Sequence, residues 1–580
     1  MTKTLRVETV AQAYLELLRD RGIDCFFANA GTDFASIVDA FARFQTEGKT
    51  TPRPIAVPHE FVAVSMAHGY YLVTGRPQVV MVHVTVGTAN GAGAVINASR
   101  TQVPVLFTAG RTPITEDGAL AGARDTHIHW AQEAFDQAGM LREYVKWDYE
   151  LRQPAQLEAV VDRALELAMA EPRGPVYLTL PREVLAQPLG ELTIASPARR
   201  QVESRRYPDP ARIDEAAERL ARARNPLIVT AELGRSRAAV DGLVALADAG
   251  AVPVLESSPV YANFPAEHPC HVGWVFGSQD YPGIAEADVV LVVDCDVPWS
   301  PARSRPADDA TVIQLAVDPF YSRYPMRSYP CDIPLAADPA VALPLLAAAV
   351  RGRVDSTAVA ARRARLAAVH RGQRETWARA AAAEAERTPI GFQWASRCIG
   401  EVLGPDTIVV NEYPLDLRHA APVGPGTSFG SPHSGGLGWA LGAALGAKLG
   451  APEKTVIATV GDGAYIFGAP TAAHLAAQVH KLPFLTVIFN NAGWEAVERA
   501  TRSVHPDGWA ATTATFPLTG LSSAARYEEI VRSFGGHGER VEDPAELPGA
   551  LRRALRVVRE EGRQAALNVI CQRQSGSPKG

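Results

Sequence analysis

Two apolar runs in the last third of the chain each end in polar residues that could bind a metal ion. Thr455–Val460 leads into a Gly-Asp-Gly triplet centred on Asp462, and Phe484–Phe489 leads into an Asn-Asn pair that ends at Asn491. Parallel strands bring their carboxyl ends to one edge of a sheet, so these polar groups are expected side by side. A carboxylate and an amide oxygen suit Mg²⁺, and a helix after the triplet offers backbone amides to a diphosphate. Either motif alone is ordinarily a turn, but together they favour a metal and diphosphate site.

These residues belong to a wider pattern that resembles the thiamine diphosphate-dependent enzymes. The match includes HSGGLGWALGAALGAKLG at residues 433–450, VNEY at 410–413 and HVTVGTANGAGAVINASRTQVPVLFTAGRTP at 83–113. The pattern is that of the benzoylformate decarboxylase and acetolactate synthase group, the three-domain, non-oxidative branch. The resemblance covers nearly the whole chain and implies thiamine diphosphate and Mg²⁺ as cofactors. The interval from Asp462 to Asn491 is slightly longer than is usual in the family.

Two further positions take their roles from this resemblance. Glu60 lies in PHEFVAVSMAHGYYLVTGRP, residues 58–77, and would otherwise be read as a charge favoured by a helix dipole. In the family, a glutamate here bonds the aminopyrimidine of the cofactor and helps to activate it. Leu437 matches the bulky apolar residue that holds the cofactor in its bent conformation, although core packing is the alternative interpretation.

The expected site has three overlapping parts. Catalytic roles are expected for Glu60, His83 and Gln132. Cofactor binding is expected from Glu60, Leu437, Gly461, Asp462, Gly463, Ala464 and Asn491, with Asp462, Asn491 and Gly493 at the metal. The substrate pocket is expected to contain Gly31, Thr32, His83, Gln132 and Trp494.

The pocket residues point to more than one reaction. His83 matches the position of a catalytic histidine of benzoylformate decarboxylase, and Thr32 keeps a hydroxyl where that enzyme has a serine; both favour decarboxylation. Gln132 instead resembles the pocket glutamine of acetolactate synthases and related carboligases. The central segment VVLVVDCDVPWSP has Pro301 near the place of the decarboxylase's second histidine, which favours carboligation or lyase chemistry.

The expected function is therefore a thiamine diphosphate- and Mg²⁺-dependent lyase or carboligase. The reaction expected first is non-oxidative decarboxylation of a 2-oxo acid, with carboligation as a second outcome. The alternatives are an acetolactate synthase-like transferase and a lyase of 2-hydroxyketones or diketones. A non-catalytic cofactor-binding scaffold is the alternative from another class, and the intact Glu60 argues against it.

Helices alternate with short apolar runs along the chain, which predicts α/β units with doubly wound parallel sheets. A chain of 580 residues exceeds what one core supports. Three units are expected: a pyrimidine-binding domain over 1–190, a Rossmann-like central domain over 207–350, and a diphosphate-binding domain over 388–580. A polar linker is expected over 190–206, and a connecting helix over 351–387. The expected strands are Cys25–Ala30, Val79–Thr85, Pro104–Ala109, Val176–Leu180, Leu227–Ala231, Asp288–Asp294, Val312–Asp318, Thr407–Asn411, Thr455–Val460, Phe484–Phe489 and Ala566–Cys571.

The amino-acid composition limits which classes of molecule this protein is expected to bind. The chain is 47% hydrophobic and 21% charged, with a net charge of -6, and therefore lacks the basic character of nucleic-acid-binding domains. No apolar run is long enough to span a membrane and no signal pattern is evident, so a cytoplasmic location is expected. The six cysteines include no C-x-x-C pair, which excludes the usual zinc motifs.

The resemblance also implies the partners of the chain. We expect a small 2-oxo acid or hydroxyketone as substrate, and a homodimer or homotetramer with active sites at subunit interfaces. No sequence pattern decides whether FAD also binds in the central unit.

Overall fold

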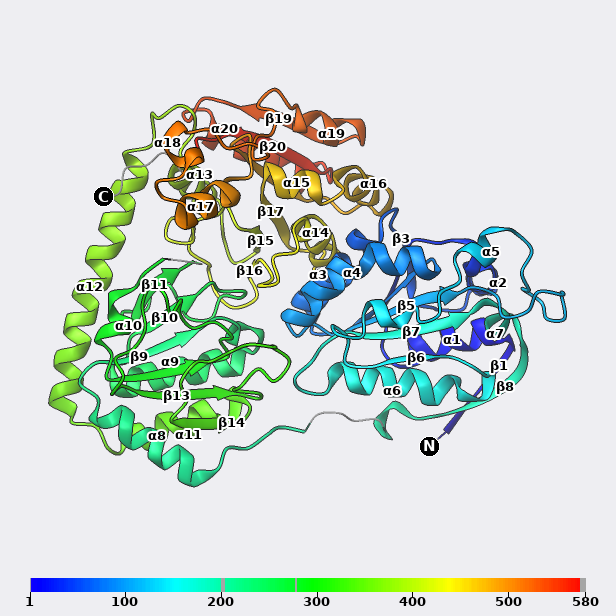
Figure 1. The fold of residues 1–580 in the computed structure, drawn as a ribbon, viewed down its shortest axis with the longest axis horizontal. Coiled ribbons are helices and arrows are strands. Elements are labelled where there is room, and N and C mark those ends of the chain that lie inside the picture. Colours follow the sequence, from blue (N-terminus) through cyan, green and yellow to red (C-terminus); the bar gives the residue numbers. More distant parts are fainter. Residues whose placement is uncertain (1, 200–203, 277–278, 574–580) are drawn as a thin grey trace.

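The computed structural model describes residues 2–199, 204–276 and 279–573. It contains three six-stranded sheets, each built from one part of the chain. In Figure 1 the first unit (blue to cyan) lies on the right, the second (green) at the lower left, and the third (yellow to red) at the top. Every strand pair within these sheets is parallel, and helices cover the sheets. The predicted class of three doubly wound α/β units is therefore confirmed.

The first sheet has the strand order β3-β2-β4-β5-β7-β6. Its strands are β2 (Cys25–Ala28), β3 (Arg53–Ala56), β4 (Gln78–Val82), β5 (Val105–Arg111), β6 (Asp148–Glu150) and β7 (Val176–Pro181). Its helices are α1 (Val10–Asp20), α2 (Ala35–Thr46), α3 (Glu60–Thr74), α4 (Val84–Arg100), α5 (Ile128–Ala131), α6 (Leu157–Met169) and α7 (Arg182–Ala186).

Two expectations for this unit need correction. Part of the segment 190–206, expected to be a linker, is strand β8 (Pro188–Ala195), which pairs antiparallel with β1 (Thr2–Thr9). Leu192 lies opposite the buried Leu5, so alternating apolar side chains hold the strand in place; residues 200–203 of that segment lie outside the described residues. The strand expected over Val79–Thr85 is shorter, because helix α4 begins at Val84 and His83 is its N-cap residue.

The central sheet has the order β11-β10-β9-β12-β13-β14. Its strands are β9 (Pro226–Thr230), β10 (Val254–Ser257), β11 (His271–Val275), β12 (Val289–Val293), β13 (Thr311–Ala316) and β14 (Ile333–Ala336). Its helices are α8 (Pro210–Arg222), α9 (Arg237–Gly250), α10 (Pro282–Glu286) and α11 (Pro339–Arg351). The long helix α12 (Ser356–Ala382) lies within the segment expected to connect the second and third units, and runs along the left edge of Figure 1.

The third sheet has the order β16-β15-β17-β18-β20-β19. Its strands are β15 (Thr407–Glu412), β16 (Ser428–Gly430), β17 (Thr455–Gly461), β18 (Leu485–Asn490), β19 (His537–Val541) and β20 (Ala565–Ile570). Its helices are α13 (Phe392–Gly400), α14 (Trp439–Gly450), α15 (Asp462–Phe467), α16 (Pro470–His480), α17 (Glu495–Val504), α18 (Trp509–Thr513), α19 (Tyr527–Ser533) and α20 (Leu547–Glu560).

In all three sheets the strand order reverses at the first strand. The first strand of each sheet pairs on one side with the strand that follows it, and on the other side with a later one: β2 lies between β3 and β4, β9 between β10 and β12, and β15 between β16 and β17. Ligands in open α/β sheets bind beyond the carboxyl ends of the strands at such switch points. The polar residues that follow β2 and β4, and those that follow β15 and β17, are therefore the first places to look for function.

Helices α3 and α14 pack against each other in the middle of the molecule and join the first unit to the third (Figure 1). Two glycines of α14 make this close approach possible. A Cβ at Gly446 would overlap the carbonyl oxygen of Met66, and one at Gly442 would lie 2.8 Å from that of Val62. The glycines in the motif 433–450 thus have a packing role. Among the described residues, no helix has the length and apolar character needed to cross a bilayer.

Candidate functional site

Glu60 begins helix α3 and is 6% exposed. Its two carboxylate oxygens accept hydrogen bonds from the side-chain amides of Asn29 (3.0 Å) and Asn90 (3.3 Å). A Cβ at Gly87 would lie 3.3 Å from Glu60 Oε1, so the glycine keeps space beside the carboxylate. Residues from β2, α3 and α4 therefore hold Glu60 at the switch point of the first sheet.

His83 lies at the same switch point, directly after β4, and both of its ring nitrogens have partners. Its Nδ1 lies 2.6 Å from Oδ1 of Asp33, and its Nε2 lies 3.2 Å from Nε2 of Gln132. The hydrogen bond to Asp33 raises the pKa of His83 above its ordinary value, although burial of the ring lowers it. The structure thus brings His83 and Gln132 together and adds Asp33, which the sequence analysis did not identify.

Gly31 and Thr32 occupy the turn between β2 and Asp33. A Cβ at Gly31 would overlap the His83 imidazole, so this position has to stay small if the ring is to lie there. Thr32 is exposed and begins a short 3-10 helix, Thr32–Phe34. Gly31 therefore lies directly beside His83, and Thr32 is the next residue along the chain.

Asp462 follows β17 and lies at the switch point of the third sheet. The carboxylate is 2% exposed, and burial raises its pKa to about 6, although the nearby backbone amides of Gly463 and Gly493 lower it. Its Oδ2 is buried and has no hydrogen-bond partner among the described residues. Such an oxygen is costly unless a cation or donor reaches it, so this residue fits a hard cation such as Mg²⁺.

The loop after β18 supplies the other expected metal residues. Phe489 pairs with Gly461 in the sheet, which brings Asn491 close to Asp462. The Asn491 side chain accepts a hydrogen bond from the backbone of Gly493 (3.2 Å) and donates one to Glu495 (2.8 Å). In the described residues no group of three or more His, Cys, Asp and Glu side chains could hold a metal, so a metal here would use amide, backbone or ligand oxygens.

Trp494 follows this loop and is half-buried. Its ring fills the space beside Gly463, where a Cβ would lie 2.5 Å from the ring, and its backbone N–H donates to the carbonyl of Thr519 (2.7 Å). Ala464 is buried in the first turn of α15. Trp494 thus packs against the Gly-Asp-Gly turn in the third unit, rather than beside His83 in the first.

Leu437 is presented by a tight turn before helix α14. Gly438 has a φ of +86°, and its N–H donates to Oε1 of Glu412 (2.5 Å), while the N–H of Ala440 donates to Oε2 (2.8 Å). Burial raises the pKa of Glu412 to about 7, although these backbone amides lower it. The VNEY motif contained this residue, but its spacing did not reveal that Glu412 caps the helix behind Leu437.

A side chain of the first unit holds the same turn. Asn97, in α4, donates to the carbonyl of Gly436 (2.9 Å), and its Oδ1 accepts from Gly436 N–H (3.2 Å) and from the Ser434 hydroxyl (2.6 Å). In the described part of the chain, however, no hydrogen bond or ion pair links Glu60 or His83 to Asp462 or Asn491. We call the residues around Glu60 and His83 the first half-site and those around Asp462 and Leu437 the second half-site.

The switch point of the central sheet does not suit FAD. Glu232, rather than a glycine-rich phosphate turn, follows β9, and Asp294 after β12 is paired with Arg235 (3.2 Å). Asp296 is paired with His433 of the third unit (2.9 Å). A dinucleotide phosphate here would meet three buried carboxylates, of which Asp294 and Asp296 are already ion-paired within the chain.

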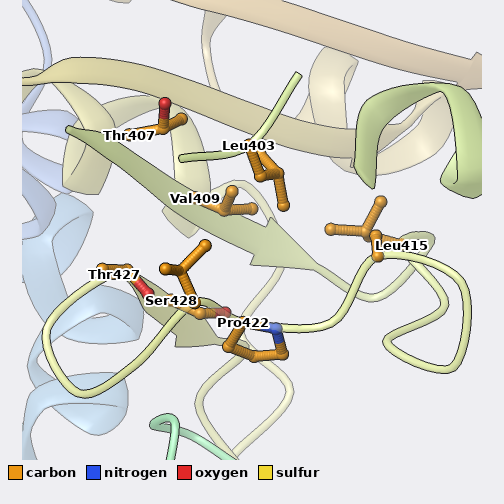
Figure 2. A pocket seen from close by; sticks show the side chains of 9 residues that line it. Leu403, Thr407, Val409, Leu415, Pro422, Thr427 and Ser428 are labelled. Carbon is orange, nitrogen blue, oxygen red and sulfur yellow. The ribbon is translucent and has the colours of Figure 1, made fainter. Parts of the chain in front are cut away.

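A small cavity beside β15 and β16 is not a substrate site either (Figure 2). Its volume of about 10 Å³ is enough for about one water molecule. It is lined by Leu403, Thr407, Val409, Leu415, Ala420, Pro422, Val423, Thr427 and Ser428.

Comparison with known proteins agrees with this division into units. Three family models match: the thiamine pyrophosphate enzyme N-terminal TPP binding domain at residues 8–140, the central domain at 213–346, and the C-terminal TPP binding domain at 416–569. Thiamine pyrophosphate is another name for thiamine diphosphate, and none of these descriptions names a flavin.

The chain is 30% identical to benzoylformate decarboxylase of Pseudomonas aeruginosa, over 95% of this chain and 97% of that protein. It is 26% identical to sulfoacetaldehyde acetyltransferase of Alcaligenes xylosoxydans xylosoxydans, over 98% and 94%. The crystal structure of benzoylformate decarboxylase from Polynucleobacter necessarius has the same fold, with a TM-score of 0.77 and 20% identity over 98% of this chain and 99% of that one. This chain belongs to the thiamine pyrophosphate enzyme family.

Proposed function

We propose that this protein is a thiamine diphosphate- and Mg²⁺-dependent enzyme that decarboxylates a 2-oxo acid without oxidation, with carboligation as a second outcome. The observation that carries the proposal is the position of His83, which lies at the same switch point as Glu60 with both ring nitrogens bonded. A histidine held in this way is suited to move a proton next to a reacting carbonyl. The similarity to benzoylformate decarboxylase supports the same reaction class.

The second half-site would hold the cofactor and the metal. Asp462, Asn491 and the backbone of Gly493 would bind Mg²⁺, and the turn Gly461–Ala464 would receive the diphosphate, while Leu437 would support the cofactor rings. When bound, thiamine diphosphate supplies the nucleophile for the carbonyl carbon and the electron sink that allows carbon dioxide to leave.

The residues of the first half-site would carry out proton transfer. The Glu60 carboxylate, oriented by Asn29 and Asn90, would share a proton with the pyrimidine ring. His83 would give or take a proton at Nε2, on the side that Gln132 contacts. Thr32 and Gln132 would line the substrate pocket at this position.

Completion of the site by a second subunit is part of the proposal. Within the described part of one chain, no hydrogen bond or ion pair links Glu60 or His83 to Asp462 or Asn491, and large apolar side chains are exposed in both units. Large apolar side chains left exposed in one chain are candidates for burial in an interface with another. These residues are Ile114, Leu120, Trp130, Phe135 and Met140 in the first unit, and Ile466, Phe467, Val504, Trp509 and Leu518 in the third. We therefore infer at least a homodimer, in which the first half of one chain faces the second half of the other.

A transferase or lyase that forms or cleaves a bond to a second carbonyl compound is the other candidate. It is favoured by Gln132, which contacts His83 directly, and by the similarity to an acetyltransferase. An exposed proline, Pro301, is the nearest match to the position of the second histidine of benzoylformate decarboxylase. Product identification separates the two: an aldehyde from a 2-oxo acid supports decarboxylation, whereas acetolactate from pyruvate supports transfer.

The first experiment is calorimetric titration of thiamine diphosphate with and without Mg²⁺. The wild type should bind only weakly without Mg²⁺, and Asp462→Ala should bind weakly in both conditions. Asp406→Ala is the matched control, because Asp406 is an exposed carboxylate of the same unit that pairs with Lys454. A screen of 2-oxo acids with product identification follows, on the wild type and His83→Ala. Absence of thiamine diphosphate binding by the wild type would contradict the proposal.

A further inference from the structure

Asp33 is a buried carboxylate that faces the expected acid-base residue. Its side chain is 4% exposed, and its Oδ1 lies 2.6 Å from Nδ1 of His83. Its Oδ2 accepts a weak hydrogen bond from the backbone N–H of Val84 (3.4 Å), the residue that follows His83. Asp33 therefore contacts both the side chain of His83 and the backbone next to it.

Two glycines make room for this pair. A Cβ at Gly31 would overlap the His83 imidazole, and a Cβ at Gly110 would overlap the Asp33 carboxylate. Strands β2, β4 and β5 are neighbours in the sheet, and each of the two side chains lies against the backbone at the carboxyl end of one of them. Packing of this kind restricts both side chains to few rotamers.

The hydrogen bonds define which ring nitrogen carries the proton. A carboxylate has no hydrogen to donate, so Nδ1 of His83 must be the donor to Asp33. In the neutral ring, Nε2 is then an acceptor, as its contact with the Gln132 amide nitrogen requires. Gln132 Oε1 is buried and has no hydrogen-bond partner among the described residues. When Nε2 gains a proton, rotation of the amide by half a turn would bring this oxygen to it.

We propose that Asp33 is a positioning residue that keeps His83 in its Nδ1–H tautomer, so that Nε2 exchanges the proton with the substrate. The side-chain amide of Gln132 then rotates by half a turn when His83 changes its protonation state. This inference rests on the proposed function for the role of His83, but the tautomer and its link to Asp33 do not require any turnover. Glu60 and His129 are nearby titratable groups whose charges also act on His83. Asp33 alone among them bonds its ring.

Imidazole ¹⁵N NMR of the histidine-labelled, full-length protein tests the inference. The His83 signals are assigned by their loss in His83→Asn. In the wild type, the neutral ring should show a protonated Nδ1 and an unprotonated Nε2. A neutral ring protonated at Nε2 would overturn the inference, and this measurement needs no variant of Asp33.

Asp33→Asn provides the second measurement. An amide oxygen can still accept from Nδ1–H, so the tautomer should persist, while loss of the negative charge should lower the titration midpoint of His83 by about one to two pH units. Asp24→Asn is the control: Asp24 is in the same unit, but its partners are Tyr70 and Arg76, so the midpoint should not move. A midpoint unchanged by Asp33→Asn would contradict the role.

A compensating variant distinguishes the effect of the negative charge next to His83 from a structural effect of replacing Asp33. Adding Gln132→Glu to Asp33→Asn places a carboxylate at Nε2 instead and should restore a raised midpoint. If turnover depends on His83, the limb of the kcat/KM pH profile that reports its titration should shift to lower pH in Asp33→Asn. It should return to higher pH in the double variant. If the NMR midpoints move as stated while no 2-oxo acid or hydroxyketone is consumed, the role of Asp33 stands and the proposed function fails.

Discussion

The two half-sites differ in how far the chain itself satisfies their buried carboxylates. In the first half, Glu60 accepts hydrogen bonds from two asparagines, and His83 is bonded through both ring nitrogens. In the second half, Asp462 keeps a buried oxygen that no group in the described residues reaches. The carboxylate of Glu60 is thus oriented by neighbouring side chains, whereas that of Asp462 keeps an oxygen that a cation or a hydrogen-bond donor could reach.

The central sheet shows that topology alone does not make a site. It has the same strand order around its switch point, but there Asp294 is paired with Arg235 and Asp296 with His433. The same strand order therefore occurs with different residues in the three units: Glu60 and His83 in the first, ion pairs in the second, and Asp462 with a buried, unbonded oxygen in the third. Function on such folds is set by the residues at the strand ends.

Removal of the proton-handling carboxylate should have the largest effect. Glu60→Gln keeps the size of the side chain but cannot hold a proton for the cofactor, so we expect turnover to fall by about 10²–10⁴-fold. Affinity for thiamine diphosphate, measured by calorimetry, should change far less, because the second half is intact. Glu47→Gln is the control, since Glu47 is a surface residue paired with Arg43. Full turnover by Glu60→Gln would remove the distinction between the halves.

Mixing two inactive variants tests whether the halves come from different chains. Glu60→Gln damages only the first half and Asp462→Ala only the second. If the chains exchange at random and each site is shared, about a quarter of all sites should be intact, and turnover should recover to that level. If both halves of a site came from one chain, every site would keep a defect and no activity would return. Light scattering on the mixture checks that the assembly is preserved.

The sequence predicted the inner part of each sheet and missed the edges. Long apolar strands such as β4, β12 and β17 are buried on both faces and read as continuous runs. The strands that were not predicted include all six edge strands, β3, β6, β11, β14, β16 and β19. Edge strands are short and partly exposed, so they lack a continuous apolar run. β10 was also missed, because it has only four residues and includes Glu256.

The candidate site was predictable where a residue belongs to a motif, and not where it depends on tertiary contacts. Asp462 and Asn491 follow recognisable strands, and the sheet brings them together. Asp33 was missed because nothing in its sequence context shows that β2 and β4 are neighbours or that the side chain is buried. Asn97 was missed for a similar reason, since its partners lie more than three hundred residues away.

Glu412 gives a pH-dependent test of the second half. Unlike Asp462, it is satisfied within the chain, by the amides of Gly438 and Ala440. Because burial raises its pKa from 4.5 to about 7, its contribution to stability is full below about pH 4.5 and is lost as the pH rises through 7, a change of about 3 kcal/mol at most.

Glu412→Gln does not titrate and should remove this dependence. The unfolding midpoint of the wild type, measured relative to that of the variant, should therefore fall steadily from pH 5 to pH 8. Glu47→Gln again serves as the control and should show no such trend. A difference that stays constant over this range would mean that Glu412 keeps an ordinary pKa in the folded state.

The smallest expected effect concerns the one side chain described above that links the two halves of the same chain. Asn97 is fully buried in α4 and bonds the turn before Leu437 through its carbonyl oxygen and its amide. In Asn97→Ala, Gly436 loses partners for both its N–H and its carbonyl. An unsatisfied buried group costs about 1–3 kcal/mol, so the thermal midpoint should fall.

Looser positioning of Leu437 should also weaken thiamine diphosphate binding several-fold in Asn97→Ala, while the His83 tautomer stays as in the wild type. Ser99→Ala is the matched control, because Ser99 is in the same helix and its side chain makes no hydrogen bond in the described structure. If Asn97→Ala lost stability but bound the cofactor with unchanged affinity, the turn would be held by Glu412 alone, and the second half would be arranged independently of the first. Weaker binding would instead show that α4 of the first unit helps to shape the cofactor site of its own chain, even if Glu60 serves the site of a second subunit, as proposed.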